Sequence, residues 1–176
     1  MLTPNDIEKY FVAEKQAGLV FLIIGAMAFM LGLVFIFVFR TPFYKGAALP
    51  LIALGLIQGI AGTTIFRRSD GDRIRNVYAY KMDPSSLREK ELPRMITVNK
   101  NFKVLKVVEI VIIIAALFLI FYFRLKPGNI FWHGLGITLF IQALLILGAD
   151  IMAEKRAHIY TEKLAVFVDN NGTAQL

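Results

Sequence analysis

Long runs of apolar residues alternate with shorter polar segments along this chain of 176 residues. A helix needs about 20 mainly apolar residues to cross a bilayer core about 30 Å thick. Four runs meet this requirement, at about 17–39, 46–66, 104–123 and 130–152. The pattern predicts an all-α polytopic membrane protein whose four transmembrane helices form two hairpins within one domain, 1–176.

The first run differs from a secretory signal peptide. A signal peptide has an apolar core of roughly 7–15 residues followed by a small-residue cleavage site. Here the run is longer and follows a charged, amphipathic lead of sixteen residues. We therefore expect a span that is retained in the protein.

Several segments outside the apolar runs also carry helix signals. Thr3 and Asp6 have the spacing of a capping box, which favours a helix that begins before the first run and continues into it. Asp83-Pro84 repeats this signal within the polar segment 67–103. We expect the lead, this segment and an extension of the fourth helix to about Phe167 to form a small helical base. Helices that lie on the membrane surface are the alternative.

The basic residues are distributed unevenly around the runs. Sixteen of the twenty Lys and Arg residues lie in the lead, in 67–106 or after residue 154. Lys and Arg in short loops mark the cytoplasmic side of a membrane protein. We therefore predict that both termini and the segment 67–103 are cytoplasmic. The glycosylation sequon Asn171-Gly172-Thr173 provides a check, because its modification would place the tail on the opposite side.

Composition narrows the classes of function. Hydrophobic residues make up 57% of the chain, above the roughly 45–50% of a soluble domain. Cysteine is absent, which excludes a disulfide framework, a thiol nucleophile and a thiolate metal site. The basic segment carries no base-stacking motif, and its charge suits anionic lipid headgroups. We expect the lipid bilayer as its partner, and no nucleic acid, metal or cofactor.

A weak internal similarity indicates two copies of one hairpin. Phe43-Tyr44-Lys45-Gly46 opens the second run, and Phe131-Trp132-His133-Gly134 opens the fourth. Ile57-Gln58 and Ile141-Gln142 follow inside these runs, although a gap is needed to align them. A duplication would place a pseudo-twofold axis along the membrane normal, as in parallel-repeat transporters. Chance likeness between two apolar hairpins is the alternative.

Small and polar residues inside the runs indicate how the helices pack. Glycines recur along the first two runs, at Gly18, Gly25, Gly32, Gly55, Gly59 and Gly62. Small residues let membrane helices approach closely, either within one chain or between chains. Gln58 and Gln142 fall near the middle of their runs, where an unpaired amide costs several kcal/mol. We expect both to face the interior, either bonded to each other or lining a polar path.

Glu109 and Asp150 are the strongest candidates for a functional site. Each lies about one turn inside the charged border of its run, on helices that a short turn connects. Ionisable groups at such positions are costly and point to function. One alternative is that they pair with cations at the interface, such as Lys106 or Arg67. The other is that they face each other in the interior and bind a proton or a cation.

Signals for chemistry are otherwise weak. The residues Asp150, Glu154, His158 and Glu162 share one helix face, but a single His among carboxylates is more typical of a solvated face than of a metal site. No nucleotide-binding or catalytic motif is present, so we expect no enzyme.

Two functions fit this sequence. The first is a non-enzymatic helical module that acts by self-assembly or as a subunit of a membrane partner. The second is a small oligomeric proton or cation channel, or a transporter-like protein. The polar residues of its path would be Glu109, Asp150, Gln58 and Gln142.

Overall fold

The computed structural model describes residues 2–124 and 126–173, and this part of the chain is helical without any strand. The long helices are α1 (Pro4–Val34), α2 (Pro42–Met82), α4 (Leu92–Phe123) and α5 (Ile130–Thr173). The short elements are η1 (Phe35–Phe39), α3 (Pro84–Ser86), η2 (Leu87–Glu91) and η3 (Pro127–Asn129). The predicted all-α class is confirmed. Four helical stretches are long and apolar enough to cross a membrane, namely Pro4–Phe39, Pro42–Met82, Pro84–Phe123 and Ile130–Asn170.

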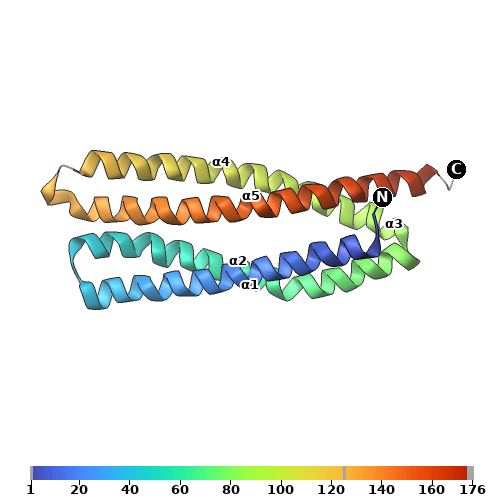
Figure 1. The fold of residues 1–176 in the computed structure, drawn as a ribbon, viewed down its shortest axis with the longest axis horizontal. Coiled ribbons are helices and arrows are strands. Elements are labelled where there is room, and N and C mark those ends of the chain that lie inside the picture. The colour runs from blue at the N-terminus through green and yellow to red at the C-terminus, as the bar shows by residue number, and fades with distance from the viewer. Residues whose placement is uncertain (1, 125, 174–176) are drawn as a thin grey trace.

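The long helices lie side by side in an elongated bundle (Figure 1). α1 packs on α2, α4 packs on α5, and contacts between α2 and α5 join the two pairs. Large apolar side chains cover the outside, as Met27, Ile60 and Phe121 illustrate. A helix that is apolar all round belongs in a protein interior or in a membrane. The exposure of these side chains therefore agrees with a lipid environment.

The two capping signals in the sequence are confirmed. The backbone N–H of Asp6 donates to Thr3 Oγ1 at 3.2 Å, and the N–H of Thr3 donates to Asp6 Oδ2 at 3.0 Å. The side chain of Asp83 caps α3 by accepting a hydrogen bond from the N–H of Ser86 at 3.4 Å. Both motifs satisfy N–H groups that a helix end leaves unpaired.

α2 continues 16 residues beyond the apolar run that was expected to end at Phe66. Polar side chains on its buried face bond to their own helix. Ser69 Oγ donates to the carbonyl of Ile65 at 2.7 Å, and Asn76 Nδ2 donates to the carbonyl of Asp72 at 2.8 Å. Buried polar groups satisfied in this way allow the helix to remain packed through a polar sequence. The chain therefore turns at Asp83 rather than at Phe66.

The largest apolar core lies outside the apolar runs, where the two ends of the chain meet. We call it the basal cluster; its buried members are Leu2, Ile7, Phe11, Ala79, Leu87, Met95, Ala157, Tyr160, Leu164, Phe167 and Val168. Tyr10 stacks on Tyr160 with ring centroids 4.3 Å apart. Most buried apolar side chains of the described residues are thus concentrated at this end of the bundle.

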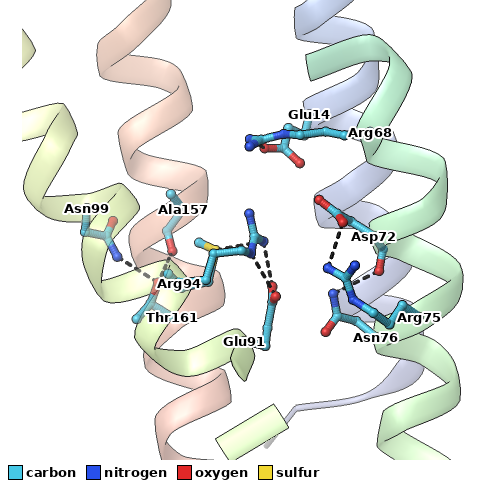
Figure 2. Close-up of polar contacts among 11 residues, drawn as sticks. Glu14, Arg68, Asp72, Arg75, Asn76, Glu91, Arg94, Asn99, Ala157 and Thr161 are labelled. Atoms are coloured by element: carbon cyan, nitrogen blue, oxygen red, sulfur yellow. Dashed lines mark hydrogen bonds and ion pairs between the residues drawn. The ribbon is translucent and has the colours of Figure 1, made fainter. Parts of the chain in front are cut away.

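A buried ion pair lies beside the basal cluster, between the two helical pairs (Figure 2). The guanidinium of Arg94 donates to both oxygens of Glu91, at 2.8 and 2.7 Å. The Glu91 side chain is only 3% exposed, and the Arg94 guanidinium lies 5.6 Å from the centre of the Phe11 ring. A bidentate geometry of this kind offsets the cost of burying two charges.

The glycines of the first two runs meet within one chain. A Cβ atom on Gly25 would lie 2.6 Å from the carbonyl oxygen of Gly55 and from the nitrogen of Gly59. A Cβ atom on Gly55 would lie 2.8 Å from the carbonyl oxygen of Gly25. Only residues without a side chain permit this approach of α1 to α2. This row of glycines, which we call the glycine seam, therefore forms the contact between α1 and α2 within one chain.

α2 and α5 make a second close approach at the opposite end from the basal cluster. A side chain on Gly46 would collide with the carbonyl of Phe131, and one on Gly134 would collide with the carbonyl of Phe43. These residues occupy matching positions in the two segments whose similarity suggested a repeat. The contact is reciprocal, as it is between elements related by a twofold axis.

Candidate binding site between the helical pairs

A cavity of about 340 Å³ lies between the two helical pairs. All four long helices contribute to its wall. α1 contributes Tyr10 to Phe21 and α4 contributes Val98 to Glu109, each at intervals of three or four residues that keep one helix face towards the cavity. Eleven residues of helix correspond to about 16 Å, so the cavity is elongated along the bundle.

Polar residues occupy the two ends of this cavity. Gln58, Glu109 and Asp150 lie at the end farther from the basal cluster, which we call the inner end. The end nearest to the basal cluster carries Tyr10, Glu14, Arg68 and Arg156 beside Val98, and we call this end the mouth. Apolar side chains line the wall between these ends, among them Phe21, Ala61, Phe102 and Leu105. The cavity is therefore amphipathic along its length.

The inner end holds two carboxyl groups from neighbouring helices. Glu109 is 7% exposed and Asp150 is half-buried, and their carboxyl groups lie within interaction distance of each other. Neither makes an ion pair with a Lys, Arg or His in the described residues. Lys106, an expected partner, pairs with Glu154 instead. The structure thus brings Glu109 and Asp150 together inside the bundle.

Several buried oxygens around the cavity have no hydrogen-bond partner in residues 2–124 and 126–173. They belong to Glu109 (Oε2), Gln58 (Oε1) and Glu14 (Oε2). Buried polar atoms are nearly always paired, so each unpaired one calls for an explanation. An amide oxygen and an ionised carboxylate are acceptors. Three residues that line the cavity therefore carry a buried acceptor that the described residues leave unsatisfied.

Gln142 lies outside the cavity. It is buried, and its Oε1 also has no partner among the described residues, but it does not line the cavity. No hydrogen bond joins it to Gln58 in the described part of the chain, although such a bond was one of the two expected arrangements. Only three of the four predicted site residues, Gln58, Glu109 and Asp150, meet at one cavity.

The mouth contains functional candidates that the sequence did not single out. Arg68 Nη2 donates to Glu14 Oε1 at 2.9 Å, which joins α2 to α1 (Figure 2). Burial raises the pKa of the Tyr10 phenol. The doublets Glu14-Lys15 and Arg67-Arg68 carry complementary charge at the borders of the first two runs. That pattern is the signal that would have identified the mouth.

The acidic stripe on α5 is the helix face with Asp150, Glu154, His158 and Glu162, and part of it is exposed. His158 Nδ1 lies 3.3 Å from Glu162 Oε1, and both side chains are well exposed. The described residues contain no group of three or more His, Asp or Glu side chains with the geometry of a metal site. His158 and Glu162 therefore have the features of a solvated helix face, whereas Asp150 of the same stripe lines the cavity.

Comparison with protein-family models, curated proteins and solved structures finds no match for this chain. A fold alone does not define an activity, so the cavity and its chemistry are the features of this chain that bear on function.

Proposed function

We propose that this chain is a non-enzymatic, multi-pass membrane protein with cytoplasmic termini that binds a proton or a cation at Glu109 and Asp150. The observation behind the proposal is the buried carboxyl of Glu109, which has an unpaired oxygen and a second carboxyl beside it. An ionised carboxylate out of water is strongly unfavourable unless a positive charge accompanies it. Since no cationic side chain of the described residues pairs with either group, the positive charge comes from a ligand.

The distribution of charge supports cytoplasmic termini. Lys and Arg concentrate at the end of the bundle that holds the basal cluster, and the positive-inside rule assigns that end to the cytoplasm. The basal cluster then packs in water, where apolar burial is effective. The cavity mouth would open at the cytoplasmic membrane border.

The arrangement favours a transporter-like protein over an open channel. Beyond the inner end, the backbones of α2 and α5 are in close contact at Gly46 and Gly134. A cation that enters from the mouth would therefore stop at the two carboxyl groups. Passage to the other side would need a movement of one helical pair against the other, and the reciprocal contact offers a pivot for it. Alternating movement of paired repeats is a known transport principle.

Proteoliposome flux tests this proposal. Purified protein would be reconstituted, and flux of protons and of Na⁺ or K⁺ would be followed under imposed gradients. We expect Glu109→Gln and Asp150→Asn each to reduce flux at least tenfold. Glu162→Gln is the matched control, because it neutralises an exposed carboxylate on the same helix as Asp150. Absence of flux in the wild type, or equal flux in all four proteins, would overturn the proposal.

A specific surface supports the second candidate, a subunit of a membrane partner. Ile74, Tyr78 and Met82 follow one another at four-residue spacing on α2 and are 65%, 63% and 71% exposed. Ile74 lies eight residues, or about 12 Å, beyond the end of the apolar run, past the depth of most lipid contact. Large apolar side chains exposed together in water mark interaction sites. Self-assembly through the glycine seam has less support, because α1 and α2 use that seam themselves.

Native mass spectrometry of protein released from lipid-like detergent tests this second candidate. A partner subunit that docks on the exposed surface of Ile74, Tyr78 and Met82 should accompany the wild type and be lost from Tyr78→Asp. Glu89→Lys changes an exposed residue away from this surface and should retain the partner. A monomer without partner in the wild type, or a partner that Tyr78→Asp retains, would contradict this role.

A further inference from the structure

We infer that the cavity between the helical pairs binds an organic ammonium ion that carries N–H donors and an apolar body. The inference rests on the proposed function and names its substrate class. The ammonium group would sit at the inner end, between Gln58, Glu109 and Asp150. The apolar body would lie along the wall towards Tyr10 and the mouth.

The size and wall of the cavity argue against an inorganic cation as its main ligand. About 340 Å³ falls within the range of roughly 300–1,000 Å³ found for small-molecule sites. Hard metal cations need about six oxygen ligands or retain their waters, whereas the inner end offers two carboxyl groups and one amide oxygen. The wall between the ends is built from apolar side chains such as Phe21, Phe102 and Leu105. Such a wall suits the body of an organic molecule.

The hydrogen-bonding character of the inner end selects the type of cation. Gln58 Oε1 and Glu109 Oε2 are buried acceptors without a partner among the described residues. A primary ammonium has three N–H donors and no acceptor, so it complements them. A quaternary ammonium has the charge but no donor, and would leave both acceptors unsatisfied at a cost. The site should therefore prefer primary or secondary amines.

The charged groups along the cavity determine which ligand charge its inner end favours. Both carboxyl groups of the inner end lack a cationic partner among the described side chains. At the mouth, Arg68 is paired with Glu14 at 2.9 Å, and Arg156 lies six residues along α5 from Asp150. An anionic ligand would meet the two acidic groups and be repelled. A neutral ligand of the same shape would gain only the apolar contacts. A cation therefore has the advantage at the deep end of the cavity.

Binding to purified full-length protein in phosphatidylcholine nanodiscs tests the inference. The probes share one apolar body and differ in the head: 2-phenylethylamine, 2-phenylethyl-trimethylammonium, 2-phenylethanol and 3-phenylpropionate. Calorimetry at pH 7 should rank the primary amine first by at least tenfold over the quaternary ion and the alcohol, with no binding of the carboxylate. Equal binding of amine and alcohol, or preference for the carboxylate or the quaternary ion, would overturn it.

Matched variants locate the site. Gln58→Leu and Gln142→Leu each remove one buried amide at mid-span, but only Gln58 lines the cavity. We expect Gln58→Leu to weaken amine binding at least fivefold and Gln142→Leu to leave it unchanged. Unfolding temperatures of both variants separate loss of binding from loss of fold. Equal weakening by both, or by neither, would remove the cavity assignment.

The ammonium has two natural sources, a soluble amine or the headgroup of phosphatidylethanolamine. Phosphatidylcholine has no N–H on its headgroup, so phosphatidylethanolamine added to the nanodiscs is a defined competitor. Competition would identify the lipid as a source, and amine binding without competition would favour the soluble amine. If Na⁺ or proton flux depends on Glu109 while no amine binds, the ligand class is wrong and the proposed function stands. If neither is observed, both fail.

Discussion

Asp6 connects the first turn of α1 to the distant end of α5. Lys163 Nζ lies 2.7 Å from Asp6 Oδ1, and Thr3 Oγ1 donates to Oδ2 at 2.7 Å. The hydrogen bond from Lys163, followed by that from Thr3, lowers the pKa of Asp6 from 3.8 to about 2. A carboxyl whose pKa is lower in the folded state stabilises that state when ionised. This stabilisation is complete above about pH 4 and is lost as the pH falls towards 2.

We expect Asp6→Asn to lower the stability of the folded protein by about 1 kcal/mol at pH 7, allowing for solvent screening and for the weakened cap. The variant should also lose less stability than the wild type between pH 4 and pH 2. Unfolding temperatures in detergent across this pH range provide the measurement. Glu8→Gln is the control, because Glu8 is exposed in the same part of α1. If both variants respond alike, the contacts of Asp6 contribute nothing specific.

Residue-scale predictions succeeded where the interaction is local in sequence. The capping box of Thr3 and Asp6 could be read because its three-residue spacing fixes its geometry. The burial of the Glu91–Arg94 pair could not, although the two residues are also three apart. Their environment depends on Phe11 of α1, which is distant in sequence and approaches only in the folded chain. Local spacing determines a contact, but not its burial.

At the scale of elements, the α1–α2 seam offers a comparison between neighbouring glycines. A Cβ atom on Gly55 would lie 2.8 Å from the carbonyl oxygen of Gly25 and 2.9 Å from the nitrogen of Phe29. A Cβ atom on Gly59, one turn along the same helix, would have no atom within 4 Å in the described structure. The backbones of both residues lie in the contact with α1, but only a Cβ atom on Gly55 would point into it.

Gly55→Ala should therefore destabilise the protein by about 1–3 kcal/mol, as overpacking does in a tight interface. Gly59→Ala should be neutral or stabilising by up to about 1 kcal/mol, because alanine favours a helix more than glycine does. Thermal unfolding in one detergent, with helicity as the readout, would measure both. An equal loss for the two variants would show that the α1–α2 seam is not packed as described.

The geometry of single helices also explains which features of the candidate site could be predicted from the sequence. The common level of Glu109 and Asp150 along the bundle could be predicted, because each lies about one turn inside the charged border of its run. The direction in which the Gln142 side chain points could not be predicted, nor could the position of Glu14 beside the cavity. A span that is apolar on all sides has no polar face to fix its rotation, so the sequence does not tell which side chains meet. The sequence did not show that α2 continues unbroken for 16 residues beyond Phe66, because two of the three buried positions there are the polar Ser69 and Asn76.

The whole molecule joins two differently packed ends around one cavity. The basal cluster ties all four long helices together at one end. At the other, α2 and α5 touch through Gly46 and Gly134 without large side chains between them. A cavity between a dense end and a narrow pivot can change shape as the helical pairs tilt. The assignment of these ends to the two sides of the membrane decides from which side a ligand enters.

Cysteine labelling can test that assignment, since the chain has no native cysteine. Lys45→Cys and Lys90→Cys change exposed residues, one in the first turns of α2 and one in η2 near the basal cluster. In intact cells, a membrane-impermeant maleimide should label Lys45→Cys and spare Lys90→Cys until the membrane is permeabilised. The sequon at Asn171 should likewise stay unmodified in microsomes; its side chains lie outside the described ones. The reverse labelling pattern would open the cavity mouth to the outside and make Glu109 a receptor for external rather than cytoplasmic cations.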